Sequence, residues 1–253
     1  MLASIDWYNP WLMGVGLNTI LLAIALLAPK KLLTPAGYVH ACLLGVLVWG
    51  TLGWQGYAVV MFYFLMGSAV TRLGMKQKEA EGIAEKRSGA RGPENVWGSA
   101  LIPALCALVS LFVSSPLREF LILAYVAGFC TKLSDTTASE IGKAYGQRTF
   151  LITTLQPVAR GTEGAVSLEG TVAGIIASGA IALFAWAIGI IDLLGMLWCI
   201  LAAFVATTLE SFIGATLQPK FDLLTNEVVN IINTIIAAAV VVLLAWGWQN
   251  FAI

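Results

Sequence analysis

Long apolar runs with almost no charge dominate this sequence and restrict the environment in which it can fold. Eight stretches are long and apolar enough to cross a bilayer, since a spanning helix needs about 17–25 such residues. They cover residues 11–28, 36–54, 56–74, 96–114, 117–133, 170–190, 193–209 and 228–248. The sequence therefore predicts an all-α transmembrane helix bundle of about eight spans, with residues 1–253 forming a single integral membrane domain.

The composition excludes the other broad classes of protein. Hydrophobic residues make up 59% of the chain and charged residues 11%, and the mean hydropathy is +0.86. A soluble globular domain carries about 25% charged residues. A soluble domain, a disordered chain and a protein that binds nucleic acid through a basic surface are therefore excluded, and we expect no nucleic-acid partner.

Two further features of the sequence fit a membrane protein. Met1–Pro10 has no basic segment, so we expect no cleaved signal peptide. The cysteines stand singly in apolar runs without a C-x-x-C spacing, and we expect them to pack as small apolar side chains. They are Cys42, Cys106, Cys130 and Cys199.

The distribution of Lys and Arg predicts the orientation. If the N-terminus lies on the non-cytoplasmic side, all the basic residues except Arg118 fall on the cytoplasmic side, as the positive-inside rule requires. Both termini are then non-cytoplasmic, and the cytoplasmic segments are 29–35, 75–95, 134–169 and 210–227. The last three are expected to form an active-site face.

Most carboxylates gather on the same side as the basic residues. Solubility alone does not require so many at a membrane face, whereas a cytoplasmic metal site would use them. For Glu79, Glu81 and Glu85 in the basic loop, the simpler interpretation is salt bridges within the loops.

The segment from Lys132 to Gly146 carries the first candidate site. Asp135 follows an apolar span, and Gly142 and Lys143 come after it. A carboxylate for Mg²⁺ followed by glycines and a lysine for phosphate is a sensible combination. In a regular helix, Asp135 and Glu140 would be about 140° apart and could not bind one metal together. The alternative for Thr137–Glu140 is a helix-capping box.

The segment from Arg160 to Gly174 carries the second candidate site. Gly161 and Gly164 let backbone N–H groups approach an anion, and Thr162 and Ser167 supply hydroxyls in front of a helix N-terminus. Phosphate would repel Glu163 and Glu169 unless a cation lay between them, which favours a bridging metal. Gly170 and Gly174 have the spacing of close helix packing, and we expect packing there.

Three more segments supply candidates on the same face. Glu210 and Ser211 follow the end of the seventh span. Three asparagines near the start of the eighth are spaced so that they form a stripe on one face of its helix. The stripe either faces a wet cavity or makes interhelical hydrogen bonds, and both remain open. The basic loop 75–95 is suited to polyphosphate, although the positive-inside rule explains its charge equally well. These candidates are Arg87, Arg91, Asn95, Asn226, Asn230 and Asn233.

The two blocks Ser134–Gly146 and Gly161–Gly170 resemble the phytyl-phosphate kinase family, which includes transmembrane protein 19. They also resemble, more distantly, the aspartate-plus-glycine and Glu-Gly-Ser blocks of phytol and dolichol kinases. Asp135 stands at the aspartate and Glu163–Gly164 at the Glu-Gly. The chain departs from those kinases with Ser134 in place of glycine and Ala165 in place of serine.

The resemblance implies phosphoryl transfer from a nucleoside triphosphate, expected to be CTP, to phytyl phosphate with Mg²⁺. The product would be phytyl diphosphate, a precursor of tocopherol and phylloquinone. The expected catalytic residues are Asp135, Glu140, Lys143 and Glu163, and the expected metal ligands are Asp135, Glu163, Glu169 and Glu210. The expected phosphate-binding residues are Arg87, Arg91, Asn95, Gly142, Arg160, Gly161, Thr162, Gly164, Ser167, Ser211, Asn226, Asn230 and Asn233.

Two other functions remain open at the level of sequence. A CTP-dependent nucleotidyltransferase would make a CDP-lipid and release pyrophosphate with the same parts. A lipid or small-molecule transporter would carry charges deep within its spans and show two related halves. The sequence also leaves open whether the protein forms a homo-oligomer.

Overall fold

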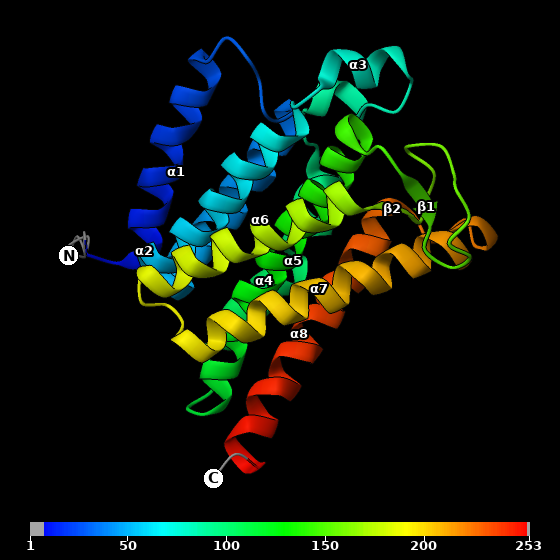
Figure 1. Cartoon of the computed structure of the whole chain (residues 1–253). Coiled ribbons are helices and arrows are strands. Elements are labelled where there is room, and N and C mark those ends of the chain that lie inside the picture. The colour runs from blue at the N-terminus through cyan, green and yellow to red at the C-terminus, as the bar shows by residue number, and fades with distance from the viewer. Residues whose placement is uncertain (1–7, 252–253) are drawn as a thin grey trace.

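The computed structural model describes residues 8–251, which form a helical bundle with one small sheet (Figure 1). The α-helices of this part are α1 (Pro10–Leu27), α2 (Pro35–Thr71), α3 (Met75–Ala80), α4 (Pro93–Val109), α5 (Leu117–Tyr145), α6 (Leu168–Ala187), α7 (Leu193–Thr216) and α8 (Asn226–Phe251). Short 3₁₀ turns lie at η1 (Lys86–Gly89) and η2 (Gln218–Lys220), and the strands are β1 (Thr149–Leu151) and β2 (Ala165–Ser167).

The 37 residues of α2 form two antiparallel arms rather than one long rod. A straight helix of this length would place its ends about 55 Å apart. The guanidinium of Arg72, just after α2, instead donates to the carbonyl of Lys31, just before it, at 3.2 Å. The reversal occurs at Gly53, whose φ of 65° belongs to the left-handed region that glycine adopts readily. The arms correspond to the predicted spans 36–54 and 56–74.

The described chain has a helix over each of the eight predicted stretches. Five helices are long and apolar enough to cross a membrane, namely α1, α2, α6, α7 with its following turn, and α8. α4 has 17 residues, and α5 carries charged residues in its second half. The membrane bundle agrees with the sequence, while the number of spans and the side of each terminus remain predictions.

Helix α5 is longer than the sequence indicated. The predicted span ended at residue 133, but the helix continues to Tyr145, so the first part of the expected loop 134–169 is helical. The segment lacks proline, and its neighbours neutralise its charged side chains. Thr137 and Glu140 lie in the interior of this helix, so the capping-box interpretation was wrong.

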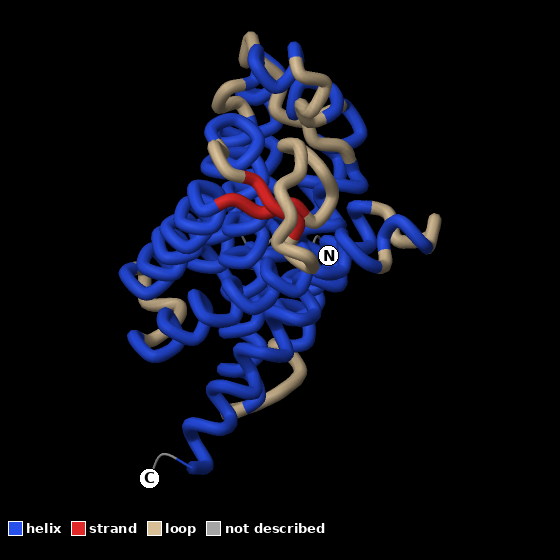
Figure 2. Tube along the Cα trace, turned by 45° about the vertical axis from the view of Figure 1, so that its right-hand side comes forward, coloured by secondary structure: helices blue, strands red, loops and turns tan. Residues whose placement is uncertain are grey.

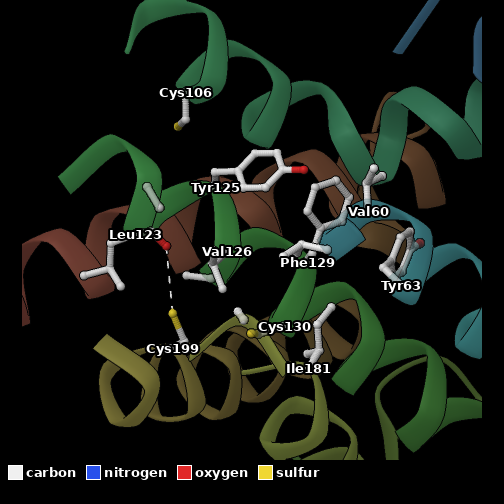
Figure 3. Packing of buried hydrophobic residues seen from close by; sticks show 14 of the residues in the cluster. Val60, Tyr63, Cys106, Leu123, Tyr125, Val126, Phe129, Cys130, Ile181 and Cys199 are labelled. Atoms are coloured by element: carbon white, nitrogen blue, oxygen red, sulfur yellow. Dashed lines mark hydrogen bonds between the residues drawn. The ribbon is translucent and has the colours of Figure 1, made fainter. Parts of the chain in front are cut away.

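Helix α5 is the centre of the bundle and contacts α2, α4, α6, α7 and α8. Tyr125, Phe129 and Cys130 are fully buried on it, as Figure 3 shows. The Tyr125 hydroxyl donates to the Gly56 carbonyl at 2.7 Å and so ties α5 to α2. All four cysteines are free, and three are buried, which confirms that they pack as apolar side chains.

A two-stranded antiparallel sheet corrects the all-α expectation. Thr149 pairs with Ser167, and Leu151 pairs with Ala165. The sheet lies on the surface of the bundle, where Figure 2 shows it in red among loops. The Ile152 amide donates to the Gly164 carbonyl at 3.1 Å, next to the paired strands. The hairpin therefore fixes the glycine-containing segment beside the start of α6.

Helices α5 and α6 approach each other closely through small residues. A Cβ atom on Gly170 would lie 2.5 Å from the carbonyl oxygen of Ala138, and one on Gly174 would lie 3.0 Å from that of Ser134. These distances leave no room for a side chain. The packing role predicted for Gly170 and Gly174 is confirmed.

Gly170→Val should destabilise the protein because its Cβ would collide with the backbone of α5. Overpacking of this kind typically costs about 1–3 kcal/mol. Gly179→Val is the matched control, since a Cβ at this position of α6 meets no atom within 4 Å. Thermal unfolding in detergent should show a clearly lower melting temperature for Gly170→Val and little change in melting temperature for Gly179→Val. Equal losses would mean that helix propensity rather than the α5–α6 contact is responsible.

Candidate functional site

A polar cleft of about 860 Å³ opens at one end of the bundle. The second half of α5, the starts of α4, α6 and α8 and the end of α7 surround it, together with segments 82–91 and 160–167. All of the predicted site residues line the cleft except Glu169 and Asn233. The lining includes Arg87, Arg91, Asn95, Asp135, Glu140, Gly142, Lys143, Arg160, Gly161, Thr162, Glu163, Gly164, Ser167, Glu210, Ser211, Asn226 and Asn230.

The floor of the cleft is a cluster of charged groups from α5 and α7, joined by an asparagine of α8. The Lys132 ammonium, 2% exposed, lies 2.5 Å from the Asp135 carboxylate and donates to Asn230 of α8. Glu210 of α7 lines the same part of the cleft and interacts electrostatically with both Asp135 and Lys132. One ammonium and two carboxyl groups from α5 and α7 thus meet at the lower end of the cleft. Lys132 was not among the predicted site residues, although a lysine at the end of an apolar run is itself a signal of a functional charge.

The asparagine stripe on α8 faces this cluster. Asn230 accepts from Lys132, the side-chain amide of Asn233 donates to Glu210, and Asn226 accepts from Gln218 at 2.5 Å. The stripe therefore makes interhelical hydrogen bonds, and two of its three members also line the cleft. Both interpretations of the stripe hold at once.

The cluster suits a hard divalent cation. The side-chain oxygen of Asn233 is buried next to the Glu210 carboxylate and has no hydrogen-bond partner in the described part of the chain. Mg²⁺ is typically held by one or two carboxylates together with substrate phosphates. Within the described residues, no three His, Cys, Asp or Glu side chains converge. Asp135, Glu210 and the Asn233 oxygen are therefore candidate ligands, and phosphate oxygens would have to complete the set.

Glu169 does not join this ligand set. It lies outside the cleft, and its Oε1 accepts from the backbone amide of Gln147 at 3.4 Å. The expectation that it is a metal ligand came from its place in a predicted phosphate-binding segment, where a cation would have to separate it from phosphate. The helical direction at the start of α6 turns the side chain elsewhere, and Glu210 takes the place opposite Asp135.

The glycine-containing segment curves along one wall. Gly161 and Gly164 have φ values of 83° and 73°, and a Cβ on Gly164 would lie 2.4 Å from that of Ala215. The Ser167 hydroxyl caps α6 by accepting from Gly170, and the Thr162 hydroxyl donates to Ala159. Both hydroxyls thus stabilise the segment itself, while Glu163 lines the cleft.

Three cations of the cleft each pair with a carboxylate from residues 81–94. Arg160 bonds Glu81 at 2.6 Å, Lys143 lies 3.4 Å from Glu85, and Arg87 bonds Glu94. The hydrogen bond from Arg87 lowers the pKa of the Glu94 carboxyl below its ordinary value. The salt bridges expected for Glu81 and Glu85 are therefore present. Glu79 instead accepts from Ser88.

Arg91 of the basic loop reaches the buried Tyr63 at the side of the cleft. Its guanidinium donates to the Tyr63 hydroxyl at 2.8 Å, which in turn donates to Ser99 at 2.9 Å. Among the described residues it has no carboxylate partner. Its charge is therefore available for a phosphate group. Tyr63 and Ser99 line the cleft but could not be recognised in the sequence because apolar residues surround them.

Glu140 has a structural partner that the sequence did not reveal. It forms an ion pair with Lys78 of α3, and both side chains are buried. Lys78 also donates to the Thr71 carbonyl at 2.9 Å. The pair fastens α3 to α5, and we therefore assign Glu140 to holding the basic loop rather than to catalysis.

Lys78→Met should destabilise the protein strongly because it leaves the Glu140 carboxylate buried without a counter-charge. Breaking one side of such a pair typically costs about 3–5 kcal/mol. Lys76→Met, two residues earlier on the exposed side, is the control and should be nearly silent. The double variant Lys78→Met/Glu140→Met should recover most of the loss in thermal unfolding. An unchanged melting temperature for Lys78→Met would contradict the anchoring role.

The sequence matches the family described as integral membrane protein DUF92 over residues 18–238. An uncharacterized membrane protein of Synechocystis is 64% identical over 92% of this chain and 90% of its own length. The chloroplastic protein VTE6 of Arabidopsis thaliana is 42% identical over 92% of this chain and 72% of its own. An uncharacterized membrane protein of Methanocaldococcus jannaschii is 29% identical over 89% of this chain and 91% of its own length.

No solved structure matches the chain. The family match covers most of the described helices, from α1 to the middle of α8, and includes every wall of the cleft. The chain therefore belongs to the integral membrane protein family DUF92.

Proposed function

We propose that this protein is a prenyl-phosphate kinase that transfers a phosphoryl group from a nucleoside triphosphate to phytyl phosphate. The observation that carries the proposal is the cluster of Lys132, Asp135 and Glu210 at the bottom of a cleft with basic walls. The sequence resemblance to phytyl-phosphate kinases and the identity with VTE6 support the same reaction class. CTP is the donor that the resemblance implies.

The cleft offers the groups that phosphoryl transfer needs. Catalysis of this reaction depends mainly on positioning and on neutralising phosphate charge. Asp135, Glu210 and Asn233 would hold Mg²⁺, which when bound screens the donor phosphates. Lys132 and Arg91 supply further positive charge. Arg87, Lys143 and Arg160 stand nearer the entrance, where a polyphosphate would exchange places with their carboxylate partners.

A phosphate acceptor fits this chemistry better than an alcohol. The second pKa of a phosphate monoester is about 6, so its attacking oxygen is already ionised near neutral pH. The new bond joins this oxygen to the terminal phosphorus of the donor, and the bond to the nucleoside diphosphate breaks. No residue has to remove a proton, whereas an alcohol would need a base.

The orientation of the cleft follows from charge. Its entrance is on the same end of the bundle as Lys30, Lys31 and Arg72, which the positive-inside rule assigns to the cytoplasm. We propose eight spans with both termini on the other side and the cleft open to cytoplasmic nucleotide. A prenyl chain would remain in the membrane while its phosphate entered the cleft.

Purified protein should convert phytyl phosphate to phytyl diphosphate in the presence of labelled nucleoside triphosphate and Mg²⁺. Free phytol should react far more slowly because it needs a base. Thin-layer separation of the labelled lipids measures both. Formation of a CDP-lipid with release of pyrophosphate would show a nucleotidyltransferase instead, and no turnover with any nucleotide would refute the enzyme.

Asp135→Asn should lower turnover by on the order of a hundredfold or more, because it keeps the shape but removes the charge that faces the metal. Asp192→Asn is the matched control. Asp192 caps α7 at the opposite end by accepting from Gly195 at 2.6 Å, and asparagine caps about equally well. Thermal unfolding checks whether both variants fold. Near-normal turnover of Asp135→Asn would place the metal elsewhere in the cleft.

A further inference from the structure

A second hollow of about 730 Å³ lies outside the cleft, between the α1–α2 connection and the α3 region. Its charged lining consists of Lys30, Lys31, Arg72, Lys76 and Arg87. Among the described residues, no carboxylate belongs to this lining. The positive-inside rule explains why cations lie at this end of the protein, but it does not explain why five of them converge on one hollow.

Most of these charges are uncompensated. Within the described residues, Lys30 and Lys76 make no ion pair, and Lys31 donates to the Leu26 carbonyl at 2.6 Å. Arg72 donates only to a backbone carbonyl, that of Lys31, and Arg87 alone has a carboxylate partner. Like charges held close together repel one another, so the hollow favours an anion.

The surface next to the hollow is apolar. Helix α1 packs on α2 at the edge of the bundle, as Figure 1 shows. In its last turn, Ile24, Leu26 and Leu27 are 59%, 56% and 87% exposed, and Lys30 and Lys31 follow after Ala28 and Pro29. An apolar strip that ends in unpaired cations matches a lipid, whose chains lie along the helix and whose phosphate lies at the membrane surface.

We propose that this hollow binds the phosphate headgroup of an anionic membrane phospholipid, with its acyl chains along α1. Soluble phosphate shares the headgroup chemistry but gains nothing from the apolar strip. Arg87 lines both the hollow and the cleft, so the lipid would bind beside the proposed kinase site. The lipid site stands independently of the kinase reaction.

Native mass spectrometry of the detergent-solubilised protein, titrated with phosphatidylglycerol or phosphatidylcholine, measures the affinity of the first bound lipid. The wild type should bind phosphatidylglycerol at least tenfold more tightly than phosphatidylcholine. Lys30→Gln/Lys76→Gln should weaken phosphatidylglycerol binding by on the order of tenfold, because each basic residue near the surface contributes to anionic lipid binding. Neither lysine makes a side-chain bond within the described chain, so both changes should be tolerated.

The matched control is Lys220→Gln/Arg148→Gln, which removes two positive charges outside both cavities and should leave lipid affinity unchanged. Equal weakening by the two double variants would show a bulk charge effect and overturn the site. Equal affinity of the wild type for the two lipids would also overturn it. Displacement of phosphatidylglycerol by an equal concentration of inorganic phosphate would refute the lipid assignment.

Discussion

The rest of the structure depends on a buried ammonium group on the central helix of an apolar bundle, at the end where the cleft opens. An unpaired charge in such a place is very costly, so Lys132 is tolerated only because Asp135, Glu210 and Asn230 surround it. These partners come from α5, α7 and α8, and their meeting point is the floor of the cleft. The electrostatic requirement that allows the lysine to be buried thus also assembles the carboxylates at which a metal and a phosphate would meet.

This arrangement also explains why the cluster has few alternative uses. A transporter moves charge across the bilayer and places it along a pathway, whereas these groups lie at one end of the bundle and face an open cleft. Because the Asp135 carboxylate is already paired with the Lys132 ammonium, it is a weak base. The cluster can therefore help to neutralise a bound metal or phosphate but is poorly suited to removing a proton from a substrate. Such a site is suited to an acceptor that arrives ionised, which is the property that separates a lipid phosphate from a lipid alcohol.

The sequence predicted those parts of the fold and site that depend on local pattern. The apolar runs predicted the position of every long helix. The two sequence blocks 134–146 and 161–170 also predicted that Asp135, Gly142 and Gly164 belong to one site, and all three line the cleft. It did not predict contacts set by tertiary packing. The extension of α5 depends on Lys78 meeting Glu140 across 62 positions, and Lys132 gains its role only from α7 and α8. Glu169 turned away because the start of α6, unlike an extended loop, fixes the direction of its side chain.

In the proposed kinase, the ion pairs in the walls of the cleft would let a charged nucleotide enter without loss of structure. Arg87, Lys143 and Arg160 are neutralised by Glu94, Glu85 and Glu81, and exposed pairs of this kind contribute only about 0–1 kcal/mol each. A triphosphate can therefore replace these carboxylates at little cost. The buried Lys78–Glu140 pair is not exposed to such exchange, so it keeps α3 on α5 while the outer pairs change partners. The basic loop can thus rearrange when the exposed ion pairs at the entrance break, because the buried Lys78–Glu140 pair still holds α3 on α5.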